Sequence, residues 1–255
     1  MNQLNVNLPE LPYAVSEAMN RLRINIKFCG KNTRKILLTS CQPNEGKSTI
    51  SAYLWKMLAE AGFPTVLVDV DLRKSVMKTR FQMDYDDDTT MGLNHYLSGM
   101  AEYEDVVYST NIPNGYMVPC TQLLENPSAL LEDIRFKELL NTLSENYRFV
   151  IIDSPPLGSV ADGALIASLC DGAVLVVRAG TTPRTLIKQS LYEIQQSGCK
   201  LLGTVLNRAD VKGRAYGKYG YGKYGYGYGY GYGYEPKDKK NSSDSAAADK
   251  NSTGK

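Results

Sequence analysis

Between residues 35 and 212 the chain alternates between short apolar runs and longer amphipathic segments. The apolar runs predict buried β-strands, because a strand that is covered on both faces carries few polar residues. They are KILLTS (35–40), TVLVDVD (65–71), RFVIIDS (148–154), GAVLVVRAG (172–180) and LLGTVLN (201–207). Segments with helical spacing lie between them, at 48–62, 128–147, near 160–170 and at 183–198. Strands that alternate with helices predict an α/β fold with a parallel sheet covered by helices on both faces.

The two ends of the chain follow other patterns. Residues 1–34 hold an extended start and then the stretch VSEAMNRLRINIKF, with Ser16 as a candidate N-cap. Its apolar residues recur at helical spacing, at Val15, Met19, Leu22 and Ile26. Residues 213–255 are polar and low in complexity, which predicts disorder. We therefore expect an N-terminal helical segment at 1–34, a folded domain at 35–212 and a disordered tail at 213–255.

The tail contains the run YGKYGYGKYGYGYGYGYGY, from Tyr216 to Tyr234. This run holds half of the 18 tyrosines of the chain, and its glycines keep the backbone adaptable because glycine gains little from helix or strand. Such a run fits an adhesive spacer, a surface on which nucleic-acid bases stack, or a flexible set of reactive phenols. Its only basic residues, Lys218 and Lys223, give little electrostatic support for nucleic acid.

Composition narrows the class of protein. The net charge of +2 offers no argument for a nucleic acid or a membrane surface as partner. The five cysteines are scattered, which fits a reducing compartment and argues against a disulfide framework or a zinc site. The first residues lack the pattern of a signal peptide, and no apolar run reaches the roughly 18–20 residues that cross a bilayer. We expect a cytoplasmic protein.

The loop after the first predicted strand has the residues of a phosphate-binding loop. In CQPNEGKST (41–49), Gly46, Lys47 and Ser48 match the end of the P-loop pattern, and Cys41 stands at its first glycine. In such a loop, backbone N–H groups surround the phosphates, the lysine reaches the β- and γ-phosphates, and the hydroxyl binds Mg²⁺. The expected nucleotide contacts are Gln42, Pro43, Asn44, Glu45, Gly46, Lys47, Ser48 and Thr49.

Carboxylates and an amide follow other predicted strands. Asp69 and Asp71 lie two residues apart, on the same side of an extended strand end, and Asp153 ends a further strand. The carboxyl ends of parallel strands share one edge of the sheet, so we expect the three aspartates to converge with the P-loop on a nucleotide–Mg²⁺ site. Asn207 ends the last strand at this edge. It is a candidate to hydrogen-bond adenine, although its spacing fits a turn equally well.

In order and spacing, CQPNEGKST, VLVDVDLRKS and FVIIDSPP resemble the Walker A, A′ and B motifs of the bacterial tyrosine kinases (BY-kinases). This family regulates capsular and exopolysaccharide assembly. The segment SEAMNRLRINI resembles its N-terminal E-x-x-R-x-x-R oligomerisation helix, and the tyrosine run resembles its autophosphorylated tyrosine cluster. The likeness spans roughly residues 13–234. It implies a P-loop NTPase-like domain that acts as a protein-tyrosine autokinase with ATP and Mg²⁺.

The resemblance also assigns roles to the residues that match the motifs. Lys47 and Ser48 match the nucleotide- and Mg²⁺-binding pair of the Walker A motif. Asp69 matches the acceptor of the phenol proton, whereas Asp71 and Asp153 match the carboxylates near the metal. The implied catalytic set is therefore Lys47, Asp69 and Asp71, and the implied metal set is Ser48, Asp71 and Asp153.

Two further sets come from the resemblance. The phosphoacceptors are the tyrosines of the run, Tyr216, Tyr219, Tyr221, Tyr224, Tyr226, Tyr228, Tyr230, Tyr232 and Tyr234. In the oligomerisation motif, Glu17 and Arg23 match the first and last residues. Asn20 stands at the middle arginine, with Arg21 beside it. We therefore assign oligomerisation to Glu17, Arg21 and Arg23, although Asn20 departs from the motif.

The partners follow from the same resemblance. It implies a separate membrane-embedded activator that recruits the chain to the inner face of the cell membrane. It also implies a homo-oligomeric ring of unphosphorylated chains, a cognate protein-tyrosine phosphatase and no nucleic acid. A positioning ATPase of the ParA/MinD type is the main alternative, but its signature lysine is replaced by Gln42. A second alternative is an ATP-responsive scaffold whose tail is modified by another kinase.

Overall fold

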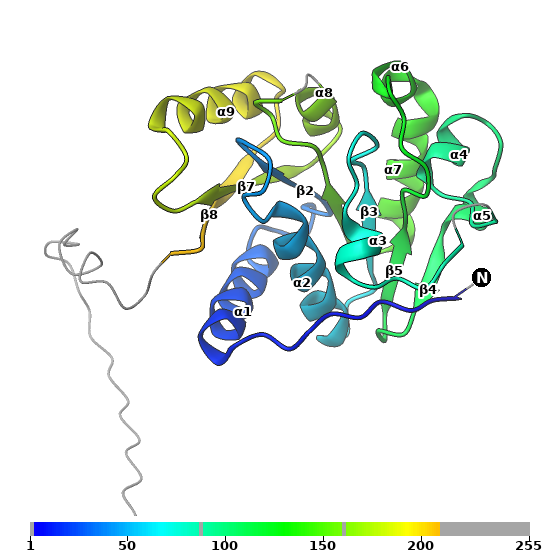
Figure 1. Ribbon diagram of the computed structural model, residues 1–255, viewed down its shortest axis with the longest axis horizontal. Helices are drawn as coiled ribbons and strands as arrows, with labels where there is room; N and C mark the ends of the chain where they lie inside the picture. Colours follow the sequence, from blue (N-terminus) through cyan, green and yellow to red (C-terminus); the bar gives the residue numbers. More distant parts are fainter. Residues whose placement is uncertain (1–2, 87–88, 160–161, 210–255) are drawn as a thin grey trace, which may run out of the picture. The chain divides into compact units, whose positions relative to one another are not determined.

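The computed structural model describes residues 3–86, 89–159 and 162–209, and residues 1–210 group into one compact unit. The predicted tyrosine cluster, 216–234, lies outside the described residues. The unit is built around an eight-stranded sheet in the order β1-β4-β5-β3-β6-β2-β7-β8 (Figure 1). The strands are β1 Gln3–Leu4, β2 Lys35–Ser40, β3 Thr65–Asp69, β4 Tyr108–Thr110, β5 Gly115–Val118, β6 Phe149–Asp153, β7 Gly172–Arg178 and β8 Leu201–Asn207.

The predicted α/β class is confirmed. The five apolar runs form β2, β3, β6, β7 and β8, and every neighbouring pair among them is parallel. Strand β5 extends this parallel part, whereas β4 pairs with β5 antiparallel and β1 pairs with β4. The pattern did not predict β1, β4 and β5, because runs of two to four residues are too short to show a period.

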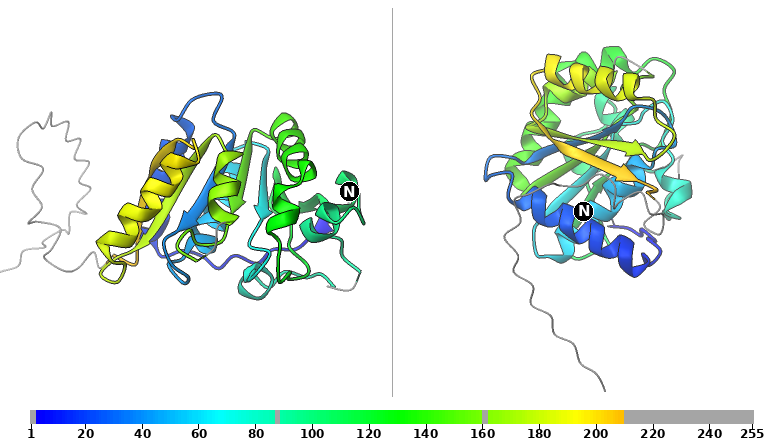
Figure 2. Two further views of the ribbon diagram at one scale, coloured as in Figure 1. Left: turned by 90° about the horizontal axis from the view of Figure 1, so that it is seen from above. Right: turned by 90° about the vertical axis from the view of Figure 1, so that its left-hand side faces the viewer.

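Helices cover both faces of the sheet. They are α1 Tyr13–Lys27, α2 Lys47–Glu60, α3 Met77–Arg80, α4 Leu93–Leu97, α5 Tyr103–Val106, α6 Ser128–Glu132, α7 Ile134–Asn146, α8 Asp162–Ser168 and α9 Arg184–Gln196. Helices α1, α2 and α3 contribute to the apolar core on one face, and α4 to α9 to the core on the other. The right-hand view of Figure 2 shows α1 and α9 on opposite sides of the sheet. Within the described residues, no helix has the length and apolar character needed to span a membrane.

The pleat of β2 shows how the sequence builds these two cores. Ile36 and Leu38 face the core formed with α1, α2 and α3, and Leu37 between them faces the other core. All three side chains are completely buried. A strand with apolar residues at successive positions therefore fits only in the middle of a covered sheet. This placement brings the loop after β2 to the centre of the carboxyl edge.

Two details of the predicted helices are wrong. The single helix expected at 128–147 is divided into α6 and α7, because Asp133 is extended and its carboxylate accepts a hydrogen bond from the backbone of Arg135 as the N-cap of α7. The predicted N-cap Ser16 lies inside α1, which begins at Tyr13 after Pro12. A proline with its fixed φ favours a helix start, and here it starts the helix upstream of the serine.

Candidate active site

The P-loop connects the carboxyl end of β2 to the first residue of α2, Lys47. Gly46 has a φ of +97°, in the left-handed region, and a Cβ atom there would lie 2.1 Å from Asn207 Nδ2. Asn44 also has a positive φ, +65°, a conformation that asparagine tolerates better than most residues. The loop thus turns sharply into α2, whose first N–H groups have no partner within the helix and suit a phosphate.

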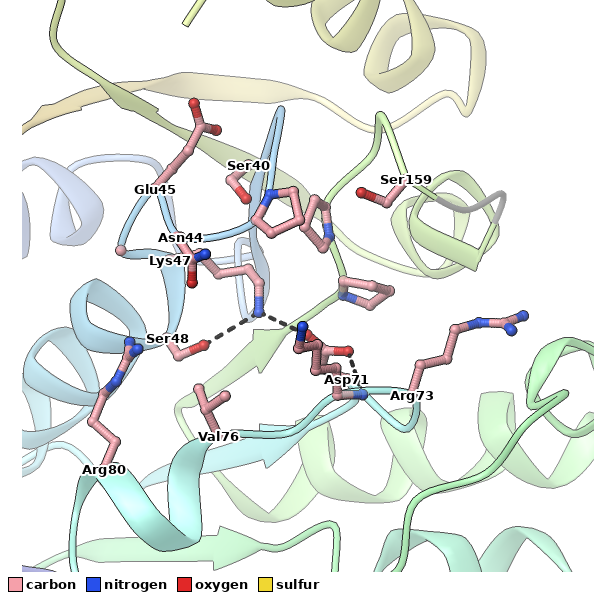
Figure 3. Close-up of a pocket in the computed structure, with 15 residues that line it drawn as sticks. Ser40, Asn44, Glu45, Lys47, Ser48, Asp71, Arg73, Val76, Arg80 and Ser159 are labelled. Atoms are coloured by element: carbon pink, nitrogen blue, oxygen red, sulfur yellow. Dashed lines mark hydrogen bonds and ion pairs between the residues drawn. The ribbon is translucent and has the colours of Figure 1, made fainter. Parts of the chain in front are cut away.

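Glu45 holds the loop in this shape. Its Oε2 accepts hydrogen bonds from the backbone N–H groups of Cys41, at 2.7 Å, and Gln42, at 3.0 Å. Its Oε1 accepts one from the Thr182 hydroxyl in the loop after β7. The carboxylate is buried and points away from Lys47 (Figure 3). Glu45 therefore braces the P-loop with its side chain and is placed to meet a nucleotide through its backbone.

Asn207 braces the same loop from the end of β8. Its Nδ2 donates to the backbone carbonyl of Glu45 at 2.8 Å, and its Oδ1 accepts from the backbone N–H of Arg208 at 2.9 Å. Both ends of the amide are thus engaged within the protein. In this arrangement Asn207 contacts the P-loop backbone, so any contact with adenine would require the amide to exchange a partner.

The ammonium group of Lys47 lies within hydrogen-bond distance of oxygen atoms from three other residues of the site. Its Nζ lies 3.1 Å from Asp153 Oδ2, 3.2 Å from Asp71 Oδ2 and 3.2 Å from Ser48 Oγ. Figure 3 shows the contacts with Ser48 and Asp71. Burial by itself would lower the pKa of Lys47, but the surrounding carboxylates outweigh it, so the pKa lies above its usual value and the ammonium stays charged. The predicted convergence of Lys47, Ser48, Asp71 and Asp153 is present in the structure.

Asp69 differs from the other carboxylates. It is the last residue of β3 and the register partner of Asp153 in β6. It is 1% exposed, its Oδ2 accepts a hydrogen bond from the Ser75 hydroxyl, and its Oδ1 has no hydrogen-bond partner among the described residues. Burial, followed by the nearby charge of Asp153, raises the pKa of Asp69 to about 8, although Ser75 and Lys47 oppose the shift.

A pocket of about 230 Å³ lies beside the P-loop. The predicted residues that line it are Pro43, Asn44, Glu45, Gly46, Lys47, Ser48 and Asp71. The wall does not include Gln42, Thr49, Asp69, Asp153 and Asn207. Residues that the sequence reasoning did not assign to a nucleotide site complete the wall, namely Ser40, Arg73, Lys74, Val76, Arg80, Pro155, Pro156 and Ser159. All but Ser40 and Arg80 lie in the loops after β3 and β6, so the rule that ligands bind beyond carboxyl strand ends was a signal that could have found them.

Arg73 and Ser51 are structural residues that the sequence reasoning missed. Arg73 Nε donates to Asp162 Oδ2 at 2.8 Å, and Asp162 also accepts from the Ser128 hydroxyl at 2.6 Å. This network ties the loop after β3 to α6 and α8 and directs the guanidinium away from Lys47 (Figure 3). The Ser51 hydroxyl, one turn into α2, donates to Asp153 Oδ1 at 2.8 Å and so orients that carboxylate. No sequence pattern pairs positions so far apart.

The oxygens around Lys47 Nζ fit a Mg²⁺ ion. Ser48, Asp71 and Asp153 each place an oxygen within 3.2 Å of one cationic atom. Mg²⁺ prefers such hard oxygen ligands and is usually held by one or two carboxylates together with substrate phosphates. Among the described residues, no cluster of three or more His, Cys, Asp or Glu side chains forms a separate metal site. The donor set therefore suits a metal that is bound jointly with a nucleotide.

On α1, the predicted oligomerisation residues lie at the surface in different settings. Arg21 is exposed, whereas Glu17 and Arg23 are half-buried. Asn20, which replaces the middle arginine of the motif, accepts hydrogen bonds from Arg23 Nη2 at 2.7 Å and Nε at 3.1 Å. Asn20, the residue that departs from the motif, is thus hydrogen-bonded to the last arginine of the motif within the same helix.

The sheet order, the P-loop and the carboxylate cluster define a P-loop NTPase-like domain, the class of proteins that bind nucleotides at this edge. A family model described as an AAA domain matches residues 33–195. The tyrosine-protein kinase CpsD of Streptococcus agalactiae is 42% identical over 208 residues, which cover 81% of this chain and 90% of that protein. The chain belongs to this family of bacterial tyrosine-protein kinases, and it is a protein-tyrosine kinase by class.

Solved structures agree. The chimerical protein CapA2B2 superposes with a TM-score of 0.72 at 33% identity, over 80% of this chain and 92% of that one. The septum site-determining protein MinD of Pyrococcus horikoshii, solved with Mg-ADP, has a TM-score of 0.56 at 25% identity, over 68% of this chain and 69% of that one. The P-loop fold is thus shared more widely than the kinase family.

Proposed function

We propose that this protein is an ATP-dependent protein-tyrosine autokinase that phosphorylates its own tyrosine cluster and thereby regulates capsular or exopolysaccharide synthesis and export. The observation that carries the proposal is the ammonium of Lys47, held by oxygens of Ser48, Asp71 and Asp153 at the mouth of a P-loop. These are the groups that phosphoryl transfer from ATP requires. The family of tyrosine-protein kinases to which the chain belongs indicates that the phosphate acceptor is a tyrosine.

In the proposed reaction the phenol oxygen attacks the γ-phosphorus of ATP, the bond from that phosphorus to the β,γ-bridging oxygen breaks, and ADP leaves. A phenol has a pKa of about 10, so its proton must be taken up as the bond forms. Asp69 accepts this proton from its ionised form, because burial raises its pKa and so makes the ionised carboxylate a stronger base than an exposed one. Lys47 exchanges the carboxylates for the β- and γ-phosphates and offsets the charge that develops there.

Mg²⁺, when bound by Ser48, Asp71 and Asp153, would neutralise phosphate charge. The residues of the chain do the rest of the work. The P-loop backbone from Asn44 to Ser48 binds the phosphates, and Glu45 keeps that backbone in shape through Cys41 and Gln42. Pro155 and Pro156 form an apolar part of the pocket wall.

The acceptors we propose are the nine tyrosines between Tyr216 and Tyr234. Strand β8 ends at Asn207, so the first tyrosine of the cluster, Tyr216, follows it by nine residues and the last, Tyr234, by 27 residues. At about 3.3–3.6 Å per residue, the tethers reach at most roughly 30 and 90 Å. The longer tether suffices to enter the site of a neighbouring subunit, which supports phosphorylation between molecules.

An assembly of several chains would bring tails and sites together. Helix α1 and the residue that follows it carry exposed apolar side chains, including Tyr13 at 82% and Phe28 at 84% exposure, near the predicted oligomerisation residues. We propose that unphosphorylated chains assemble through this helix. Each phosphate adds about −1.5 to −2 charges, so a few of them overturn the net charge of +2 and the tails repel each other. A phosphatase resets this cycle, and a membrane-embedded activator recruits the kinase from the cytoplasm.

The decisive experiment incubates the purified chain with Mg-ATP and locates phosphotyrosine by mass spectrometry. We expect phosphate between Tyr216 and Tyr234 in the wild type and none in Lys47→Met. Mixing full-length Lys47→Met with an active chain that lacks the tyrosine cluster tests transfer between molecules, because only the inactive chain can then be labelled. Release of inorganic phosphate without any phosphotyrosine would refute the kinase and favour a positioning ATPase.

A scaffold modified by another kinase is the alternative of a different class. It predicts that wild type and Lys47→Met are equally unlabelled in the purified reaction and equally labelled in cell extract. The replacement of the signature lysine by Gln42 argues against the positioning ATPase.

A further inference from the structure

The wall of the active-site pocket carries more basic than acidic residues. The carboxylate of Glu45 is taken up by backbone and hydroxyl donors and points away from Lys47 (Figure 3). Lys47 pairs with Asp71 at 3.2 Å. Arg73 pairs with Asp162, outside the wall, at 2.8 Å. The remaining basic residues of the wall are Lys74 and Arg80, which we call the rim pair.

The side chains of the rim pair have no carboxylate partner among the residues that the structure describes. Arg80 Nη1 donates to the hydroxyl of Thr49, a neutral acceptor, at 3.2 Å. A guanidinium has five N–H donors, so others remain for a ligand. Lys74 is fixed through its backbone, whose N–H donates to Asp71 Oδ1 at 3.2 Å. Two cations without a counter-charge in one pocket favour an anionic ligand.

The rim pair lies at the open side of the pocket. Both of its residues are exposed, whereas Lys47, Ser48 and Asp71 are buried. Figure 3 shows the guanidinium of Arg80 beyond Ser48 as seen from the ammonium of Lys47. The phosphates of ATP have the P-loop N–H groups, the lysine and Mg²⁺ as partners inside the pocket. The rim pair therefore faces the ligand that arrives from outside, which in a kinase is the acceptor peptide.

The proposed acceptor becomes anionic as it is used. Between Tyr224 and Tyr234 tyrosine alternates with glycine, so the nearest tyrosines to any acceptor are two residues away. Two residues of extended chain span about 7 Å. Each phosphotyrosine carries about −1.5 to −2 charges, and arginine and lysine bind phosphate through charge-assisted hydrogen bonds. A phosphate beside the reacting tyrosine thus has the charge that complements the rim pair.

We propose that Lys74 and Arg80 form a phosphate-binding subsite for the acceptor, which binds a phosphotyrosine two residues from the tyrosine that is being phosphorylated. This inference rests on the proposed kinase function. It makes a partly phosphorylated cluster a better substrate than an unphosphorylated one, so phosphorylation spreads from the first tyrosine to its neighbours. The substrate class is a peptide whose tyrosine has a phosphate monoester close by.

The test uses two synthetic peptides that span residues 224–234 and keep Tyr228 as the single acceptor. In the first peptide, every other tyrosine is replaced by phenylalanine. The second peptide is identical except for phosphotyrosine at positions 226 and 230. The kinases are full-length and carry phenylalanine at the nine tyrosines of the cluster, so that their own tails are not acceptors. With Mg-ATP and an intact rim pair, we expect the KM for the phosphopeptide to be about tenfold lower, with a similar kcat.

The double variant Lys74→Gln, Arg80→Gln removes both charges of the subsite. We expect it to reduce the difference between the peptides to about twofold or less, with the KM for ATP within about twofold of the kinase with an intact rim pair. The matched control combines Lys31→Gln with Lys200→Gln and changes the net charge equally. Both lysines are exposed and precede β2 and β8, at the edge of the sheet opposite the pocket. The control should keep the preference for the phosphopeptide.

Equal KM values for the two peptides with an intact rim pair would overturn the subsite, and so would a preference that survives the double substitution. A double variant that binds ATP more weakly but keeps the preference would assign both residues to the nucleotide and overturn it as well. Failure to phosphorylate either peptide would refute the proposed kinase function instead. Fluorescence anisotropy of the labelled phosphopeptide without ATP then decides the subsite, because equal binding by the intact and double-variant chains would overturn it, whereas about tenfold weaker binding by the double variant would support it.

Discussion

Two carboxylates buried at the active site, one in the P-loop and one at the end of β3, differ in their hydrogen-bond partners. In the P-loop, 41–46, the buried carboxylate of Glu45 uses both oxygens to bind backbone and hydroxyl donors. At the end of β3, Asp69 is equally buried but leaves Oδ1 without a partner among the described residues. A satisfied charge stabilises one loop shape, whereas an unsatisfied one costs stability. The hydrogen bonds of Glu45 thus hold the P-loop in one shape, whereas burial without a full set of partners raises the pKa of Asp69.

The two aspartates at the carboxyl end of β3, Asp69 and Asp71, also differ in their surroundings. Asp71 lines the pocket and pairs with Lys47 at 3.2 Å, whereas Asp69, two residues earlier, is excluded from the pocket. β3 ends at Asp69, so Asp71 belongs to the loop that follows and no longer obeys the alternation of the strand. Two buried carboxylates of identical chemistry therefore differ in position and partners, since only Asp71 reaches the pocket and Lys47.

The largest effect we expect is on catalysis. Asp69→Asn removes the proposed proton acceptor and should lower the rate of tyrosine phosphorylation by about 10²–10⁴-fold. The affinity for ATP should be unchanged, because Asp69 does not line the pocket. Initial rates with radiolabelled ATP and nucleotide titration by fluorescence check both parts. Weaker ATP binding in Asp69→Asn would contradict the separation of the two aspartates.

The second largest effect should come from removing the Glu45 side chain, which holds the P-loop in shape. Glu45→Ala removes hydrogen bonds of a charged acceptor, each of which contributes about 1.5–3 kcal/mol. We expect ATP affinity to fall by about 10–100-fold, measured by isothermal titration. The control Glu60→Gln alters an exposed carboxylate at the other end of α2 and should leave the affinity unchanged. If Glu45→Ala binds ATP like the wild type, the loop is not held by this side chain.

The buried carboxylate should also appear in the pH dependence of stability. In the folded, nucleotide-free protein the pKa of Asp69 is about 8, far above the usual aspartate value of 3.8, so the folded state keeps a proton that the unfolded state has lost. This term lowers stability by about 1.4 kcal/mol per pH unit between roughly pH 4 and pH 8. Denaturant melts should show this decline in the wild type and in Asp71→Asn. A decline that persists in Asp69→Asn would assign it to another group.

The smallest effect should come from Asn207. Asn207→Ala deletes one neutral hydrogen bond to the P-loop, which contributes about 0.5–1.5 kcal/mol, so ATP affinity should fall by roughly 2–10-fold. The same substitution removes Asn207 Nδ2, the atom that would lie 2.1 Å from a Cβ atom at position 46. Gly46→Ala should therefore be less harmful in the Asn207→Ala background, although the φ of +97° still disfavours alanine. Equal ATP affinities of Gly46→Ala in the two backgrounds would show that this contact is unimportant.

Much of the fold could be predicted from the sequence because it depends on local patterns. Continuous apolar runs marked the parallel strands β2, β3, β6, β7 and β8, and the residues after β2 marked the P-loop. The rule that parallel strands share a carboxyl edge brought Lys47, Asp71 and Asp153 together correctly. The short strands and the division of 128–147 at Asp133 were missed, since a period needs more residues than these elements contain.

By itself, the sequence determined the class of fold, the position of the P-loop and the edge of the sheet at which its residues meet the aspartates. Only the tertiary structure decided which of these groups reach the pocket and which are sealed behind it. Burial and hydrogen bonding depend on segments far apart in the chain, as when Thr182 meets Glu45 and Asn207 meets the P-loop. A carboxylate has the same chemistry at positions 69 and 71, and the protein around it places one in the pocket wall beside Lys47 and the other behind that wall.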